Sequence, residues 1–582
     1  KVPCFPFEKF PGADPSLGTR MKATGEVLAL GTDLAGALLK AYRGLGSRVT
    51  EPGFWGETDR GALEEALTVP TDRRIGALFE WGRRGLDPEE AARISGIHPF
   101  FCRELAELGA LERALGEGDL TPERLREAKA RGLGDRRIGQ IRGLSEREVR
   151  RLRREHRVEP GFREVDGCAG ETPAGSRYLY GVYGGASDPT SRDDRPAVVV
   201  LGSGPIRIGQ GLEFDYCCVK AVEALRRRGY RGVLVNDNPE TVSTDHDVSD
   251  ALYLAPLATE DVLEVCRREK VAGAFVTFGG QTALRLAQGL QEEGVSLLGT
   301  SFEAIQAAED RDLFSRILSD LGLSQPPGRG VRNLEEGIAA AEALGFPLMV
   351  RPRFVLGGLA MRRVRDREGF EAVLEEAFRA APGQSVLVDR FLEGREFEVD
   401  ALCDGSEVLI PGIFEHLDPA GIHSGDSMAL FPQLSLRPEE TRFVEQAVRS
   451  LSEALGLAGL LNVQFVHSRG RLWILEANPR GSRTVPIVSK LTGLPLVDWA
   501  VGLGLGEHLG DLTDLRGLLE PTGPMGVKIP VFSGEKLPGA ETLLGPLMQS
   551  TGESLGVGDS LAEAFREAAG GAGWRLPSRG TL

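Results

Sequence analysis

Residues 461–484 read LNVQFVHSRGRLWILEANPRGSRT, two largely apolar runs separated by a short polar turn. This pattern predicts a β-hairpin that turns near Ser468–Gly470. In that register Gln464 lies roughly opposite Glu476, and Asn478 shares the face of Glu476 because side chains alternate along a strand. The hairpin therefore brings three oxygen-bearing side chains together.

The residue types of this hairpin favour a Mg²⁺ site. Carboxylate and amide oxygens suit a hard divalent cation, which keeps further positions for water and substrate phosphates. Arg480 and Arg483 follow directly and suit an anionic substrate or a transferred phosphoryl group, whose charge must be neutralised. A solvent-exposed polar hairpin is the alternative. It is disfavoured because the polar groups lie beside a buried apolar flank, which makes them costly without a ligand: Leu460, Val463, Leu472 and Ile474.

Three further stretches contain candidate binding residues, although each one alone reads as an ordinary turn or a solvated strand face. Residues 346–352 predict a strand that places Arg351 at its end, and Phe354–Gly358 follow as a glycine hairpin able to close over phosphates through backbone N–H groups. Residues 386–402 predict two strands joined by a short connector. Three carboxylates then share one strand face, where one of them could accept hydrogen bonds from a ribose: Glu396, Glu398 and Asp400. Residues 421–427, GIHSGDS, read as a turn between strands.

Upstream of this region the pattern is that of a parallel α/β sheet. Strands are predicted at 197–201, 232–236 and 271–277, with a helix running to about residue 228 and another after Gly279–Gly280. After about residue 306 the strands alternate apolar and polar residues, as antiparallel strands do.

The turn at 202–211 reads GSGPIRIGQG and resembles a dinucleotide-binding loop. The third glycine of G-x-G-x-x-G falls on Arg207, so we expect a structural lobe and no NAD or FAD binding. No P-loop motif occurs in the sequence.

Residues 60–160 have helical periodicity with little strand signal. Ser145 and Glu148 predict a capping box for a helix that runs through Arg154. The arginines at 150, 151, 153, 154 and 157 are expected to form a solvated helix face neutralised by neighbouring glutamates, because no aromatic residues accompany them as in a nucleic-acid patch. Residues 160–195 read as a loop-rich linker.

The two ends of the chain resemble each other. Residues 1–31 are matched by residues 528–558 without a gap, at an offset of 527. Self-similarity of this kind indicates duplicated structure. We therefore expect one complete unit preceded by the tail of another, within a natural polypeptide of about twice this length. The first residue is Lys1 rather than Met, which also suggests a fragment or a processed chain.

Composition limits the class of protein. The 582 residues, 41% apolar and 26% charged, predict several globular domains. A net charge of −16 disfavours nucleic-acid binding. The sequence has no apolar run long enough to predict a membrane span, and we expect no secretory leader. Seven cysteines without a C-x-x-C pair predict buried reduced thiols in a cytoplasmic protein.

Taken together, the motifs resemble the large subunit of carbamoyl-phosphate synthetase, specifically its C-terminal half. The resemblance is carried by residues 202–211, 236–245, 351–358, 421–427 and 476–486. It implies a multidomain α/β fold, in which a Rossmann-like pre-ATP-grasp lobe precedes an ATP-grasp module and an all-helical oligomerisation domain is added.

The implied domains are five. They are a tail of the preceding ATP-grasp module at 1–44, the helical oligomerisation domain and linker at 45–190, the pre-ATP-grasp domain at 196–305, the second ATP-grasp domain at 306–510, and at 511–582 the C-terminal part of that module, leading to a missing allosteric domain.

The resemblance also implies an activity, the phosphorylation of carbamate by ATP, with Mg²⁺ or Mn²⁺, to carbamoyl phosphate. This step would belong to the glutamine-dependent synthesis of carbamoyl phosphate, which supplies arginine and pyrimidine biosynthesis. Residues implied in nucleotide binding are Arg351, Arg390, Leu392, Glu396, Gly421, Ile422, His423, Ser424, Gln464 and Glu476. Implied metal ligands are Gln464, Glu476 and Asn478, and the implied catalytic residues are Asn478, Arg480 and Arg483. The short connector before Glu396 leaves Glu398 as an alternative at the ribose.

The implied partners are a glutaminase small subunit, the missing first synthetase half and the missing allosteric domain, with self-association through the helical domain. No nucleic acid or membrane is expected. Two other functions stay open: another ATP-grasp carboxylate–amine ligase, and a non-catalytic assembly module whose ATP site only regulates.

Overall fold

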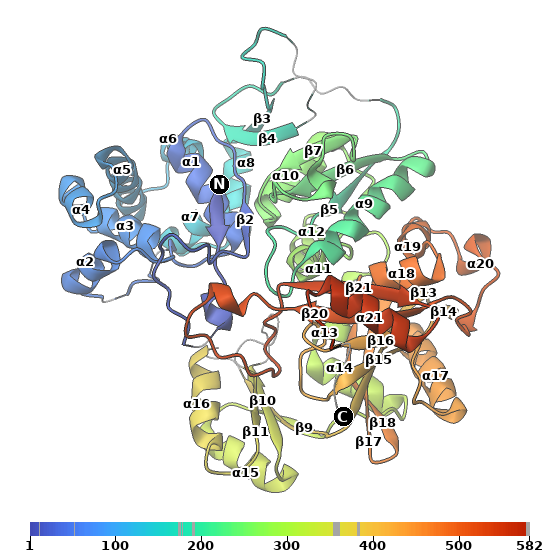
Figure 1. Cartoon of the computed structure of the whole chain (residues 1–582). Helices are drawn as coiled ribbons and strands as arrows, with labels where there is room; N and C mark the ends of the chain where they lie inside the picture. The colour runs from blue at the N-terminus through green and yellow to red at the C-terminus, as the bar shows by residue number, and fades with distance from the viewer. Residues whose placement is uncertain are drawn as a thin grey trace. The chain divides into compact units, whose positions relative to one another are not determined.

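The computed structural model describes residues 1–10, 12–51, 53–56, 58–172, 176, 178–188, 193–352, 361–380 and 385–577. The expected glycine hairpin Phe354–Gly358 lies outside these residues. The chain forms two compact units, shown in Figure 1. The first unit comprises Lys1–Phe7, Ala13–Ile206 and Leu225–Ser296, and the second comprises Glu8–Gly12, Arg207–Ala224 and Leu297–Leu582.

The first unit contains the expected helical region. Its apolar helix faces share one core that includes Leu63, Phe79, Trp81 and Leu108. The predicted capping box is confirmed, because the side chains of Ser145 and Glu148 bind each other's backbone N–H groups. The helices are α1 (Leu34–Leu45), α2 (Arg60–Thr68), α3 (Arg74–Arg83), α4 (Pro88–Ser95), α5 (Pro99–Gly116), α6 (Pro122–Ala130), α7 (Asp135–Arg142) and α8 (Glu146–Glu155).

The arginines of α8 are not all solvated, so that expectation is wrong in part. Arg150 and Arg153 are buried. Arg150 is paired with Glu146 and with Glu293 at 3.0 Å. Arg153 is paired with Asp135 at 3.2 Å and with Glu264 at 2.8 Å. The predicted neutralisation by acidic residues is confirmed. The ion pairs of Arg150 and Arg153, however, join α8 to other segments of the unit and do not lie on a face exposed to water.

A six-stranded sheet in the order β3-β4-β7-β6-β5-β8 completes the first unit. Its strands are β3 (Pro160–Glu164), β4 (Tyr178–Tyr183), β5 (Ala197–Leu201), β6 (Arg231–Asn236), β7 (Ala251–Leu254) and β8 (Gly273–Phe275). All pairings except β3–β4 are parallel, which confirms the predicted parallel sheet. The linker expected at 160–195 instead includes the β3–β4 hairpin, whose Phe162, Leu179 and Val182 are buried. The other helices are α9 (Leu212–Arg227), which begins in the second unit, α10 (Thr259–Glu269), α11 (Gly280–Leu284), α12 (Ala287–Glu292) and the 3₁₀ turn η2 (Val242–Thr244).

The glycine-rich turn after β5 packs against a side chain. The Gly204 N–H donates to Asn236 Oδ1 at 3.0 Å. A Cβ on Gly202 would lie 2.4 Å from Cγ of the same asparagine. The turn therefore needs glycine to admit Asn236, which supports a structural role over dinucleotide binding.

The second unit contains two sheets. A four-stranded sheet has the order β11-β10-β12-β9, and a nine-stranded sheet follows the path β18-β17-β13-β15-β16-β20-β21, with β14 and β19 beside it. All pairings except β14–β19 are antiparallel, as the alternating sequence predicts.

The strands of the second unit are β9 (Gly328–Val331), β10 (Leu348–Pro352), β11 (Arg362–Val364), β12 (Val386–Arg390), β13 (Arg395–Asp404), β14 (Val408–Ile410), β15 (Phe414–Pro419), β16 (Ala429–Phe431), β17 (Ala458–Ser468), β18 (Arg471–Asn478), β19 (Gly517–Leu518), β20 (Met525–Val531) and β21 (Gly552–Gly558). Its helices are α13 (Phe302–Glu309), α14 (Arg311–Asp320), α15 (Leu334–Leu344), α16 (Phe370–Ala380), α17 (Pro438–Leu455), α18 (Val485–Thr492), α19 (Leu496–Gly504), α20 (Leu509–Leu512) and α21 (Leu561–Gly571), with the 3₁₀ turn η3 (Gly534–Lys536). A third 3₁₀ turn, η1 (Phe7–Lys9), begins in the first unit.

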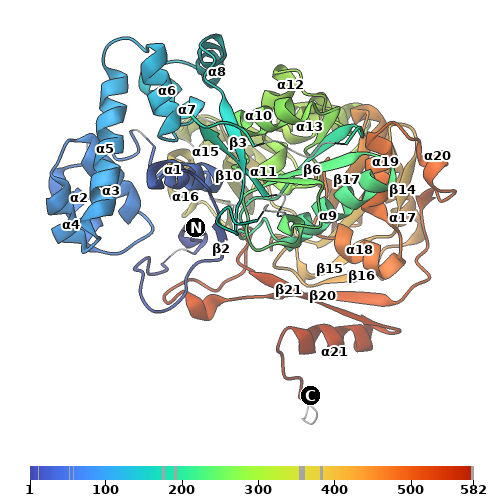
Figure 2. The ribbon, with the colours of Figure 1, turned by 90° about the horizontal axis from the view of Figure 1, so that it is seen from above.

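The sequence repeat has the same local structure in both copies. In the first copy β1 (Val2–Cys4) pairs with β2 (Gly25–Val27), and Pro3 faces Glu26. In the second copy β20 pairs with β21, and Pro530 faces Glu553, which is the same register at the offset of 527. The helices α1 and α21 begin at equivalent residues. Figure 2 shows α21 lying along β20 and β21.

The two copies also meet within the second unit, at equivalent glycines. A Cβ on Gly12 would lie 2.8 Å from the Gly539 carbonyl oxygen, and a Cβ on Gly539 would lie 2.7 Å from the Gly12 carbonyl oxygen. Both residues have a positive φ, 79° and 81°. Only glycine combines that backbone conformation with so close a mutual approach.

Within the described residues, no helix has both the length and the apolar character needed to cross a membrane.

Candidate active site

The β17–β18 hairpin positions the expected metal ligands. Gln464 pairs with Glu476, and Asn462 pairs with Asn478. Arg469 and Gly470 form the turn with positive φ values of 51° and 76°. The predicted register is therefore confirmed, with a bulge after Gln464.

Hydrogen bonds join the end of β18 to the arginine loop that follows. Asn478 Nδ2 donates to Glu476 Oε1 at 3.0 Å, and Arg480 Nη2 donates to Asn478 Oδ1 at 3.2 Å. In the described part of the chain, no group of three or more His, Cys, Asp or Glu side chains is placed to hold a metal. The set at the hairpin is of another kind, one carboxylate and two amides. Such a set fits Mg²⁺, which takes few protein ligands and shares its sphere with phosphates.

A buried carboxylate fixes the loop that carries both arginines. Asp400 on β13 accepts hydrogen bonds from Ser482 Oγ and Thr484 Oγ1, each at 2.6 Å, and from Asn462 Nδ2 at 3.1 Å. Burial and then Glu398 raise the pKa of Asp400 to about 6, although these bonds oppose the shift. The sequence suggested Asp400 only as one of three similar carboxylates, so this anchoring role was missed.

The raised pKa of Asp400 predicts a pH-dependent contribution to stability. Because the folded state binds the proton more tightly than the unfolded chain, this contribution falls as pH rises from about 4 to about 6. Relative to an Asp400→Asn variant, the free energy of unfolding of the wild-type chain should fall by up to about 3 kcal/mol across that pH interval. Denaturant unfolding from pH ~4 to ~7 measures the difference. The control Asp320→Asn, at an exposed position, should show no such trend. A flat difference for Asp400→Asn contradicts the assignment.

The structure separates Glu396 from Glu398. Glu396 Oε1 accepts the Gly421 N–H at 3.1 Å, so it lies beside the 421–427 loop. Burial raises its pKa. Glu398 is buried beneath, with His416 Nε2 at 3.7 Å from its Oε1. Burial acts to raise the pKa of Glu398, but His416, followed by Lys528 and Asn462, leaves it below the usual value. Glu396 therefore contacts the 421–427 loop, whereas Glu398 lies beside His416.

The 421–427 loop is built closely against its neighbours. Gly421 has a φ of 97°, and a Cβ there would lie 2.6 Å from the Phe391 ring. The His423 N–H donates to the Gly545 carbonyl at 2.8 Å, and His423 Nδ1 accepts the Gly425 N–H at 3.1 Å. Burial, followed by Arg483 and Lys9, holds the pKa of His423 well below its ordinary value. His423 is therefore neutral at physiological pH. Ile422 and Ser424 are partly buried beside it.

Cations gather where this loop meets the arginine loop. A Cβ on Gly425 would lie 2.4 Å from Arg483 Nη1, so the two loops are in contact. Arg483 Nε lies 3.7 Å from Glu213 Oε1. The Arg480 guanidinium stands 5.7 Å from the centroid of the Phe214 ring.

Lys528 adds a third cation to this region. Its Nζ donates to the Ser424 carbonyl at 2.8 Å, and burial lowers its pKa. Sequence reasoning missed Lys528, Glu213 and Phe214 as site residues. Lys528 drew notice only as the repeat equivalent of Lys1.

Three expected nucleotide residues belong to the four-stranded sheet and to its connector to β13. Arg351 is on the four-stranded sheet, where its Nε donates to Asp389 Oδ2 at 3.2 Å. Burial raises the pKa of Asp389 to about 6, against the effect of Arg351. The Arg390 side chain is exposed at the end of β12, and Leu392 lies in the connector to β13. Asp389 thus fixes the orientation of the Arg351 side chain.

Comparison with known proteins places these features in a family. Three domain families match in chain order: the carbamoyl-phosphate synthetase large chain oligomerisation domain at 26–157, the carbamoyl phosphate synthase preATP-grasp domain at 194–307, and the carbamoyl-phosphate synthase L chain ATP binding domain at 310–512. The carbamoyl phosphate synthase large chain of Thermomicrobium roseum is 46% identical over 578 residues, 98% of this chain. The chain belongs to the carbamoyl phosphate synthase large-chain family.

Its fold is therefore a pre-ATP-grasp lobe and an ATP-grasp module with a helical oligomerisation domain, as expected. The large chain of Clostridium perfringens (strain 13) is 44% identical over 97% of this chain. The large chain of Thermoanaerobacter sp. (strain X514) is 42% identical over 100% of this chain. The chain spans about half the length of these relatives, 53–54%. The biotin carboxylase–β,γ-ATP complex from Campylobacter jejuni is 14% identical with a TM-score of 0.49, over 59% of this chain and 77% of that one.

Proposed function

We propose that this chain is an ATP-grasp ligase that phosphorylates carbamate with ATP to give carbamoyl phosphate. The observation that carries the proposal is the β17–β18 pairing, in which Gln464 faces Glu476 and Asn478 links Glu476 to Arg480. Membership of the family supports the same reading. The chain would be the carbamate-phosphorylating half of a longer large chain. That large chain would take part in the glutamine-dependent synthesis of carbamoyl phosphate for arginine and pyrimidine biosynthesis.

Each residue then has a role that its position supports. Gln464, Glu476 and Asn478 would hold Mg²⁺ or Mn²⁺, which supplies charge neutralisation at the phosphates when bound. Arg480 and Arg483 would neutralise the carbamate and the phosphoryl group in transfer. Asp400 keeps both arginines in place through Ser482 and Thr484.

The 421–427 loop and Glu396 would contact the nucleotide, with Glu396 at the ribose. Neutral His423 would contribute hydrogen bonding without adding charge. Arg351, held by Asp389, would reach the phosphates from the other sheet. The reaction needs no covalent enzyme intermediate, so orientation and charge neutralisation are the chain's contribution.

The activity is tested by carbamate-dependent release of ADP and, in reverse, by ATP synthesis from ADP and carbamoyl phosphate. We expect both with Mg²⁺ present and neither after EDTA treatment, with recovery when Mg²⁺ or Mn²⁺ is added back. ADP release that ignores carbamate but responds to another carboxylate would favour a different ATP-grasp ligase. ATP binding in calorimetry without turnover in either direction would favour a regulatory assembly module.

The partners are also part of the proposal. A glutaminase small subunit, the first synthetase half and an allosteric domain would complete the enzyme, since the chain spans about half of its relatives. The helical domain would mediate self-association, as the description of the matching family suggests. Light scattering of the whole chain over a concentration series would test the self-association.

A further inference from the structure

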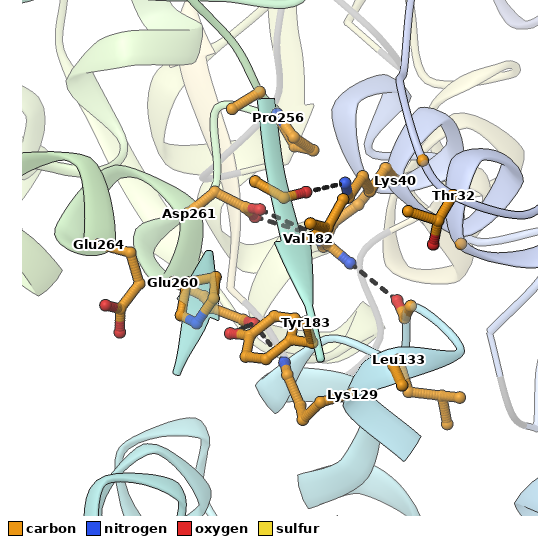
Figure 3. A pocket seen from close by; sticks show the side chains of 18 of the residues that line it. Thr32, Lys40, Lys129, Leu133, Val182, Tyr183, Pro256, Glu260, Asp261 and Glu264 are labelled. Atoms are coloured by element: carbon orange, nitrogen blue, oxygen red, sulfur yellow. Dashed lines mark hydrogen bonds and ion pairs between the residues drawn. The ribbon is translucent and has the colours of Figure 1, made fainter. Parts of the chain in front are cut away.

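A pocket in the first unit lies outside the proposed phosphorylation site. It has a volume of about 40 Å³ and is lined by α1, α6, β4 and α10. Figure 3 shows Lys40, Lys129, Tyr183, Glu260 and Asp261 around it. One water needs about 10–15 Å³ on this measure, so the pocket has room for about three water-sized groups.

Two lysines line this pocket, and their partners differ. Lys129 Nζ is ion-paired with Asp135 at 2.9 Å and with Glu260. Lys40 Nζ instead donates to two backbone carbonyls, those of Leu30 at 2.7 Å and of Gly181. Within the described residues, no carboxylate forms an ion pair with Lys40.

The surroundings of Lys40 explain why its pKa is lowered. Burial lowers its pKa to about 8, Asp261 opposes this shift, and Arg43, one turn along α1, acts in the same direction as burial. Both oxygens of Asp261 accept hydrogen bonds from Arg43 at 3.1 Å, so this carboxylate is paired with the arginine. The ring of Tyr180 on β4 lies with its centroid 6.0 Å from Nζ. The charged groups that face Lys40 are Asp33 and Arg43 on α1 and Glu260 and Asp261 on α10.

We propose that Lys40 is a site of carbamoylation by carbamoyl phosphate, the product of the proposed reaction. The amine lone pair attacks the carbonyl carbon, a C–N bond forms, and the C–O bond to phosphate breaks. The amine proton leaves with the phosphate, so the products are a carbamoyl-lysine and inorganic phosphate. The step needs no oxidant or reductant.

The pocket suits this product in three respects. The added group has three heavy atoms, and the pocket has room for about three water-sized groups. The product is uncharged, which relieves the cost of a partly buried ammonium that, among the described residues, is not ion-paired with a carboxylate. It still carries N–H groups, so it can donate to the carbonyls of Leu30 and Gly181. Lys129 is a poor competitor because an ion-paired ammonium has no lone pair to react.

The experiment uses the whole chain and ¹³C-labelled carbamoyl phosphate, with peptide mass spectrometry across a pH series. Lys270, an exposed lysine in the same unit, is the reference. At pH ~8 we expect Lys40 to be labelled at least roughly tenfold faster than Lys270, because each unit of pKa changes the neutral amine fraction about tenfold. The Lys40→Arg variant should lose this label and keep that of Lys270. In guanidinium chloride the preference should disappear.

Labelling of Lys40 no faster than Lys270, or a preference that survives in guanidinium chloride, would overturn the proposal. The inference rests on the proposed function only for the natural source of the reagent. Because the reagent is added, failure of labelling leaves the proposed function untouched, and absence of carbamate-dependent ADP release leaves the labelling result interpretable.

Discussion

Replacing Glu476 by glutamine should lower carbamate-dependent ADP release by about 10²–10³-fold, the usual cost of removing one electrostatic group from a transition state. The substitution keeps the shape of the side chain and its place opposite Gln464. It removes the one carboxylate of the expected metal set and leaves three amides. We also expect the Mg²⁺ concentration for half-maximal activity to rise, which a purely structural role would not cause.

The matched control is Glu453→Gln, an exposed glutamate on α17 in the same unit. It should retain activity and metal dependence within about twofold, as expected for surface substitutions. If Glu476→Gln and Glu453→Gln behave alike, Glu476 does not hold the metal. Unfolding midpoints of both variants should match that of the wild-type chain, which separates loss of the site from loss of the fold.

Replacing Lys129 by methionine should cost about 3–5 kcal/mol of stability, the effect expected when one partner of a buried ion pair is removed. Lys129 is 1% exposed and sits between Asp135 and Glu260. Burial acts to raise the pKa of Glu260, but Lys129 and then Arg43 hold it well below its usual range. Without the lysine, Arg43 and Arg153 are the cations that still act on Glu260, and part of the charge of Asp135 and Glu260 is left uncompensated.

Arg126→Met on the same helix is the control. Arg126 pairs with Glu123 at 3.3 Å, and both side chains are more than half exposed. Its loss should change stability by no more than about 0.5 kcal/mol. Urea unfolding followed by circular dichroism measures both variants. Equal midpoints for Lys129→Met and Arg126→Met would show that the buried network adds nothing beyond a surface pair.

The parts of the site that follow a strand's alternation could be predicted from the sequence. Gln464, Glu476 and Asn478 sit on one hairpin, where a period of two and a recognisable turn fix which side chains meet. Arg480 and Arg483 follow within a few residues. β5 was also predicted to the residue, because its five apolar residues lie between Pro196 and Gly202.

Residues brought in by tertiary packing could not be predicted in this way. Lys528 reaches Ser424 from a strand more than a hundred residues away, and Glu213 and Phe214 come from α9. Arg150 and Arg153 belong to a helix of high charge that looks solvated in sequence. Their acidic partners Glu293 and Glu264 lie in distant segments. Local pattern carries no information about such pairings.

The mutual contact of Gly12 and Gly539 has an evolutionary consequence. Each glycine's backbone oxygen occupies the space that a side chain on the other would need, so replacing either glycine by a larger residue would cause a clash. The two copies of the repeat are thereby coupled, because a side chain at either glycine would require the backbone to move at the other, 527 residues away. Sequence divergence between the copies should be slowest at this junction.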